Sequence, residues 1–351
     1  MTTKPFQPKR VVIYAVGIEH YHSRDTGQIP PVRYAKDDAQ AFVAAMRDLW
    51  APTVEEFEVT TVVDAEASLT RIRDDLGYII SGLDADDMFI FYYAGHGFHG
   101  AGGNRLTAAD TNISSLENTT ALVRDTIIKP LEASACKHSL LFIDACAADL
   151  MDGFTIRDVI SSMAPAEYAA FLRSSEYSAV FLSCKPKEKS FSCHMLKHGV
   201  WTWHLIQALL GTADDAIDAQ RWVTDASLRN YLTTNVAKYV RDVMKMKGTQ
   251  TPQAWITATG CVPIRLVPVP TVLPPPTDLS GFILVPTRTT LSVQSGGGIK
   301  QLRGFRSGNV VPTGHTSGAH SFVKKLLAED VADEGREFLK KHPGRDRPSP
   351  R

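Results

Sequence analysis

A histidine and a cysteine in this chain each follow an apolar run, and together they have the chemistry to cleave a peptide bond. A thiol attacks a carbonyl as the thiolate, so a catalytic cysteine needs a base that removes its proton and later returns it to the leaving amine. Histidine suits this role because its pKa lies near neutral pH. His96 follows the run 87–94, and Cys146 follows the run 137–145. The pair predicts a thiol hydrolase with His96 as base and Cys146 as nucleophile.

The apolar runs that precede these two residues predict buried strands of a parallel sheet. We expect the strand 87–94 to end in a loop at Gly95, His96 and Gly97. Strands that alternate with helices predict an α/β fold, in which sites form beyond the carboxyl ends of the strands. The expected strands are 11–18, 57–63, 87–94, 137–145 and 178–183, and the expected helices are 38–50, 68–81 and 199–210.

Each of the two residues also has a simpler interpretation. A lone cysteine at a strand end is usually a small buried residue, and a Gly-His-Gly segment is often only a turn. The catalytic hypothesis is favoured because His96 and Cys146 occur together, in this order and at the same expected edge of the sheet.

Composition excludes some functional classes. The 351 residues carry 38 basic and 38 acidic side chains, so bulk electrostatics does not predict nucleic-acid binding. No apolar run approaches the roughly 20 residues that cross a bilayer, and the N-terminus has no apolar secretory core. We therefore expect a cytoplasmic protein with no membrane partner. The five cysteines lack CxxC spacing, which indicates reduced thiols.

Several ordered motifs resemble the caspase-like peptidases of the caspase–hemoglobinase clan, and most closely metacaspases and prokaryotic caspase homologues. The resemblance covers residues 9 to about 265. Its motifs are the opening strand 11–17, the segment 34–39 that resembles the family's "NDA" helix start, the histidine loop 94–97, the Asp-Ala-Cys of 144–146, the small-subunit block 198–211 and its usual ending 250–253.

This resemblance implies a caspase-like, mostly parallel sheet flanked by helices, and it assigns the catalytic roles. Cys146 is expected to attack the scissile carbonyl, and His96 to act as general base and then general acid. The backbone N–H groups of Gly97 and Cys146 are expected to bind the oxyanion. The chemistry needs no metal and no cofactor. Calcium activates some metacaspases, but no Asp-rich loop here resembles an EF-hand.

The resemblance also implies a preference for a basic residue before the cleaved bond, at the position called P1. Asp38 and Asp144 occupy the positions that line the S1 pocket of metacaspases, and two carboxylates favour a cationic side chain. The alternative interpretation is that Asp38 only caps its helix. The basic segment 184–190 leaves the sign of the pocket open, and Glu188 is a candidate for the acid that metacaspases carry there.

Basic residues between positions 157 and 189 indicate that the chain is a zymogen that processes itself. A protease that cleaves after Arg or Lys finds candidate sites between the two parts that resemble the large and small subunits. These sites are Arg157, Arg173, Lys185, Lys187 and Lys189.

We predict three regions from these patterns. Residues 1–266 form the peptidase domain, with a large-subunit-like part (1–156), a linker (157–177) and a small-subunit-like part (178–266). Residues 267–278 form a proline-rich linker. Residues 279–351 form a small C-terminal module with a disordered end; it carries 12 basic and 6 acidic residues, against 26 and 32 before it.

The resulting functional hypothesis is a cysteine endopeptidase, belonging by family resemblance to a regulated cell-death or antiviral defence pathway. Its expected partners are protein substrates and an activating partner or small signalling ligand. The alternative is a signalling or binding module that keeps the caspase fold without catalysis, since a fold does not guarantee a function.

Overall fold

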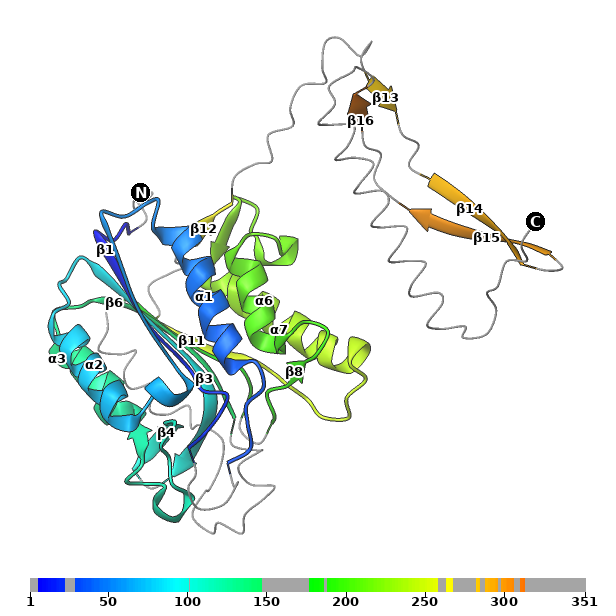
Figure 1. Cartoon of the computed structure of the whole chain (residues 1–351). Helices are drawn as coiled ribbons and strands as arrows, with labels where there is room; N and C mark the ends of the chain where they lie inside the picture. Colours follow the sequence, from blue (N-terminus) through cyan, green and yellow to red (C-terminus); the bar gives the residue numbers. More distant parts are fainter. Residues whose placement is uncertain are drawn as a thin grey trace. The chain divides into compact units, whose positions relative to one another are not determined.

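The computed structural model describes residues 6–22, 29–100, 102–146, 177–185, 188–257 and 263–267, and four strands nearer the C-terminus. Within them, the side chain of Cys146 and those of the four C-terminal strands are outside the description. The chain divides into two compact units, Met1–Val269 and Pro270–Arg351 (Figure 1). The expected linker 267–278 and the end of the C-terminal module lie almost wholly outside the described residues, so those predictions stay open.

The first unit is built on a mostly parallel sheet with the strand order β11-β7-β6-β3-β1-β2. Neighbouring strands from β2 to β7 pair in parallel, and β11 pairs antiparallel with β7. The strands are β1 (Arg10–Gly17), β2 (Glu56–Val63), β3 (Asp87–Gly100), β6 (His138–Cys146), β7 (Tyr177–Leu182) and β11 (Gln253–Ile256).

Helices cover both faces of this sheet (Figure 1). One face packs against α1 (Ala35–Trp50), α6 (Val200–Leu209) and α7 (Asp225–Lys238), and the other against α2 (Leu69–Ser81) and α3 (Lys129–Ala133). Successive β1 residues alternate between the two cores, since strand side chains point to opposite faces. Side chains on both faces of the inner strands β1, β3 and β7 are therefore buried, and these strands are nearly continuous hydrophobic runs.

Shorter elements connect this framework. They are β4 (Gly103–Thr107), β5 (Thr120–Leu122), β8 (Ser192–Cys193), β9 (His198–Gly199), β10 (Trp222–Thr224), β12 (Pro263–Leu266), the 3₁₀ turns η1 (Asp64–Glu66), η2 (Ile113–Ser115) and η4 (Asp214–Ala216), and the π-helical turns η3 (Arg124–Ile128) and η5 (Tyr239–Val243). Val267, one residue past the expected domain end, is buried in the core.

One expected boundary is wrong. The strand predicted to stop at residue 94 continues to Gly100, because β6 pairs with Gly95 and His96, and β4 folds back and pairs antiparallel with the last four residues. Phe98, in this extension, is buried against Ile29 and Leu116. The glycines here do not end the strand, since a neighbouring strand satisfies the backbone hydrogen bonds.

The helix start that carries Asp38 is held close to the sheet. A Cβ on Gly17, the last residue of β1, would collide with the carbonyl oxygen of Ala35 and with Ala39 in α1. The residue before α1, Tyr34, has a left-handed backbone with φ of 71°. This tight turn from the preceding segment into α1 brings Asp38 to the carboxyl edge of the sheet.

In the second unit, the described strands are β13 (Phe282–Leu284), β14 (Arg288–Ser295), β15 (Gly298–Phe305) and β16 (Val310–Pro312). They pair antiparallel as β14 with β15 and β13 with β16. In the part of the chain that the structure describes, no helix has the length and apolar character needed to cross a bilayer.

Candidate active site

The two predicted catalytic residues are register partners. Strands β3 and β6 are neighbours in the sheet, and the pairing aligns His96 with Cys146 at their carboxyl ends. Adjacent strands lie about 4.8 Å apart, so the backbones of residues fifty positions apart in sequence become neighbours. The sheet therefore brings together the histidine and cysteine that the sequence separates.

The imidazole of His96 is held in one tautomer. The side chain is buried, with 2% of its surface exposed, and its Nε2 lies 2.7 Å from the backbone oxygen of Pro30. A carbonyl oxygen only accepts hydrogen bonds, so Nε2 carries the proton. In the neutral ring, the lone pair that takes up a further proton is then on Nδ1.

Three hydroxyl groups fix the backbone of His96. Its N–H donates to the hydroxyl of Tyr21 at 3.0 Å. Its carbonyl accepts from the hydroxyls of Tyr93 at 2.8 Å and Thr107 at 3.0 Å. Gly95 leaves room for these groups, because a Cβ there would lie 2.5 Å from the Tyr93 hydroxyl oxygen and 3.1 Å from that of Tyr21.

The residues expected to bind an oxyanion lie next to this pair. Gly97 follows His96 in β3 and pairs with Leu106 of β4, and Cys146 is the last residue of β6. Their oxyanion role stays a prediction.

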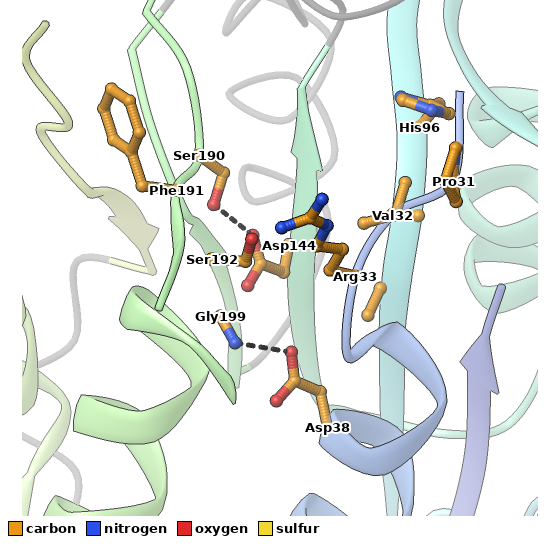
Figure 2. A pocket seen from close by; sticks show the side chains of 12 residues that line it. Pro31, Val32, Arg33, Asp38, His96, Asp144, Ser190, Phe191, Ser192 and Gly199 are labelled. Carbon is orange, nitrogen blue, oxygen red and sulfur yellow. Dashed lines mark hydrogen bonds between the residues drawn. The ribbon is translucent and has the colours of Figure 1, made fainter. Parts of the chain in front are cut away.

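A pocket of about 250 Å³ opens beside His96 (Figure 2). Its walls come from the segment before α1, the ends of β3 and β6, and the segment that contains β8 and β9. It therefore forms where residues from four parts of the sequence meet at the carboxyl edge of the sheet. Its lining residues are Pro31, Val32, Arg33, Asp38, Ala94, Gly95, His96, Asp144, Ser190, Phe191, Ser192 and Gly199.

The Asp38 carboxylate forms hydrogen bonds with residues of β9 and does not cap its own helix. Its Oδ1 lies 2.6 Å from Nδ1 of His198, and its Oδ2 accepts the backbone N–H of Gly199 at 2.9 Å. The N-cap of α1 is Tyr34, which makes no side-chain cap bond. Burial raises the pKa of Asp38 to about 7, and the charge of Asp144 adds to this rise. The helix-cap alternative for Asp38 does not hold.

Asp144 lies in the same pocket and is held by hydroxyl groups. Its Oδ1 accepts from Ser190 Oγ at 2.7 Å, and its Oδ2 accepts from Thr202 Oγ1 at 2.9 Å. Thr202 is also hydrogen-bonded to the buried hydroxyl of Tyr92 at 2.8 Å. Burial raises the pKa of Asp144, and these hydrogen bonds oppose the rise.

Gly199 separates the two carboxylates. A Cβ on this residue would lie 3.0 Å from Oδ2 of Asp144 and 3.0 Å from Oδ2 of Asp38. The two oxygens are thus no more than about 6 Å apart, on either side of a residue that has no side chain. One cationic group of the size of an ammonium or guanidinium reaches both.

Two features of the pocket were absent from the sequence prediction. Arg33 lines it and is solvent-exposed, with its guanidinium on the side of Asp144 (Figure 2). His198, which is not itself a lining residue, pairs with the lining residue Asp38. The only sequence signal for His198 was that it opens the small-subunit block, and Arg33, one residue before the motif segment 34–39, had none.

Glu188 does not replace the acid that metacaspases carry. It lies outside the pocket lining, and its carboxylate accepts hydrogen bonds from Thr249 and from both the backbone and the hydroxyl of Thr251. These hydrogen bonds connect the loop after β7 to the segment before β11. The buried side chain of Gln250 strengthens this link, because it bonds to Ser190 and to the backbone N–H of Phe191.

Of the expected processing sites, Lys185 is exposed and Lys189 is partly exposed in this loop. Arg157, Arg173 and Lys187 lie outside the described residues. Among the residues that the structure describes, no cluster of three or more His, Cys, Asp or Glu side chains could hold a metal ion.

A mostly parallel sheet flanked by helices on both faces is the caspase-like fold that the sequence predicts. The caspase-domain family model matches residues 10–262, so the chain belongs to the caspase-domain family, whose members are cysteine peptidases. The resemblance predicted from the motifs is thereby confirmed.

Solved structures similar to this chain share little sequence identity with it. A protein from Geobacter sulfurreducens is 15% identical, with 72% of this chain and 94% of that chain covered and a TM-score of 0.47. Caspase-1 from Spodoptera frugiperda is 17% identical, with 74% and 91% covered and a TM-score of 0.46. No curated protein matches the chain.

Proposed function

We propose that this chain is a cysteine endopeptidase in which Cys146 is the nucleophile and His96 the general base. The observation that carries the proposal is the register pairing of these residues at the carboxyl ends of β3 and β6. The hydrogen bond from His96 Nε2 to Pro30 adds support, since it leaves the lone pair on Nδ1.

The reaction follows from this arrangement. Nδ1 of His96 takes the thiol proton, the sulfur of Cys146 bonds to the scissile carbonyl carbon, and the carbonyl electron pair moves to oxygen. The backbone N–H groups of Gly97 and Cys146 are the proposed donors to that oxyanion. When the C–N bond breaks, the amine takes the proton from Nδ1. Water, deprotonated by His96, then hydrolyses the thioester, and the Pro30 carbonyl stabilises the imidazolium formed in each step.

A basic P1 residue is the proposed specificity. Asp38 and Asp144 are nearly buried in the pocket next to His96, and Ser190 and Thr202 donate hydrogen bonds to Asp144. A cation that enters such a pocket loses solvent but gains charge-assisted hydrogen bonds. Arg33 adds a positive charge to the same pocket, and the test therefore includes acidic P1 residues.

The experiment compares purified Cys146→Ala, His96→Ala and wild type on fluorogenic peptides with P1 Arg, Lys, Asp and Asn. We expect turnover of the Arg and Lys peptides by wild type and its loss in both variants. Cys136→Ala is the matched control, because Cys136 is a free cysteine that precedes the opposite end of β6, about 30 Å away from Cys146 along the strand. It should retain activity.

Thermal unfolding of each variant separates loss of chemistry from loss of fold. Near-wild-type activity in either dyad variant would refute the assignment of the dyad. Absence of turnover on every peptide by folded wild type would favour the alternative, a silent caspase-fold module. A role in cell death or antiviral defence belongs to this proposal through family resemblance alone.

A further inference from the structure

The two carboxylates of the pocket differ in what compensates their charge. Asp38 is bonded to the imidazole of His198, a group that becomes a cation. Asp144 is bonded to two hydroxyl groups, which stay neutral. In the described part of the chain, no lysine or arginine forms an ion pair with Asp144.

The other charged and titratable groups nearby do not remove this difference. Arg33 is solvent-exposed in the pocket, where water screens it, and the hydroxyl of Tyr92 is a buried neutral group behind Thr202. Asp37 is exposed on α1, and its charge helps to keep His198 protonated. His194 is bonded to the hydroxyl of Tyr34 and not to either carboxylate.

The protonation states agree with the geometry. The hydrogen bond to Asp38 raises the pKa of His198, while burial raises that of Asp38 to about 7. Around neutral pH the pair therefore holds one shared proton, and its net charge is close to zero.

We propose that His198 sets the P1 specificity of the pocket by neutralising the charge of Asp38. The negative charge that a P1 cation meets at neutral pH is then that of Asp144. The inference rests on the proposed function. The substrate class that fits is a peptide whose P1 side chain brings one positive charge to Asp144, so Lys and Arg are both accepted. Asp38 mainly shapes the pocket and holds Gly199, until a higher pH deprotonates His198 and its charge becomes available.

The test compares P1 arginine with P1 citrulline, which has nearly the same shape but no charge. The ratio of the two kcat/KM values measures how much the pocket gains from charge. At pH 7 we expect Asp144→Asn to lower this ratio about 10- to 100-fold, the value of a lost charge-assisted hydrogen bond. We expect Asp38→Asn to lower it less than about 3-fold. Asp48→Asn, the same change at an exposed residue of α1 outside the pocket lining, should leave it unchanged.

The pH dependence gives a second prediction. As pH rises from 6.5 to 9, the wild-type ratio should increase, because His198 loses its proton and uncovers the charge of Asp38. The ratio should stay flat in Asp38→Asn and still increase in Asp144→Asn. An Asp38→Asn loss at pH 7 as large as that of Asp144→Asn would overturn the proposal.

A readout without turnover separates this inference from the proposed function. Histidine NMR of Cys146→Ala should show that the pKa of His198 is raised above its ordinary value, and Asp38→Asn should return its titration to the ordinary range. If His198 titrates at or below its ordinary value, the compensation is absent and the inference fails. If the wild type cleaves no basic peptide while the NMR result holds, the proposed function fails but the compensation of Asp38 by His198 stands.

Discussion

Replacing Gly95 by alanine tests whether the tyrosine hydroxyl groups place His96. The new Cβ would lie 2.5 Å from the hydroxyl oxygen of Tyr93, closer than carbon and oxygen can approach without bonding. Tyr93 is fully enclosed, with 1% of its surface exposed, and cannot move away freely. Either this ring or the backbone of residues 95 and 96 must shift.

The magnitude follows from packing. Adding a methyl group to a filled interior costs about 1–3 kcal/mol. For a domain of this size, each 1 kcal/mol lowers Tm by about 2–4 °C, so we expect a fall of about 2–12 °C. A displacement of about 1 Å at His96 is expected to lower kcat/KM by about 100-fold.

The matched control is Gly77→Ala, the same change on the exposed side of α2. A Cβ at Gly77 meets no atom within 4 Å. Alanine in a helix interior is more stable than glycine by about 0.5–1 kcal/mol, so Tm should rise slightly and activity should stay the same. Thermal unfolding and peptide kinetics of both variants give the comparison.

A Gly95→Ala variant with the Tm and kcat/KM of wild type would refute the argument, because it would show that the hydroxyl groups of Tyr93 and Tyr21 do not limit the position of His96. A lower Tm with unchanged kcat/KM would keep the packing argument and remove the link to catalysis.

Three further predictions follow from the sequence and the structure. Active enzyme is expected to cut itself between Arg157 and Lys189, which mass spectrometry would show as fragments present in wild type and absent in Cys146→Ala; an uncut wild type that turns over peptides would exclude this. A chain that ends at Val269 should fold with the Tm of the first unit and be at least as active as full length, whereas an insoluble product would show that the second unit belongs to the same core. Burial of His204 lowers its pKa to about 4, below the ordinary value of 6.5. As pH falls from 6.5 to 4, the unfolded chain therefore binds a proton that the folded chain does not. The free energy of unfolding should fall by about 3 kcal/mol over this range in wild type and not in His204→Asn.

The order of the elements and the residues at their carboxyl ends could be predicted from the sequence alone. Apolar runs that end in Gly95-His96-Gly97 and in Asp144-Ala145-Cys146 identify buried strands and the residues at their carboxyl edge, since burial on both faces of a parallel sheet demands continuous apolar sequence. Motif resemblance added the expected roles of Asp38 and Asp144, which stay predictions. Local patterns are sufficient here because each of these signals is contained within about ten neighbouring residues.

The end of β3 was not predictable in the same way. Gly95 and Gly97 read as a loop, yet the strand continues to Gly100 because β6 and β4 supply hydrogen-bond partners. Whether a glycine-rich segment is extended depends on a neighbour, and no local pattern identifies that neighbour.

The contacts that complete the site were decided only by the tertiary structure. The register that aligns His96 with Cys146, the Pro30 carbonyl on the imidazole and the pairing of His198 with Asp38 each join residues between 50 and 160 positions apart. Hydrogen bonds of this kind depend on distances of a few tenths of an ångström between segments whose adjacency is a property of the whole sheet. The sequence therefore determined which groups are available at the site, and the fold determined which of them share a proton.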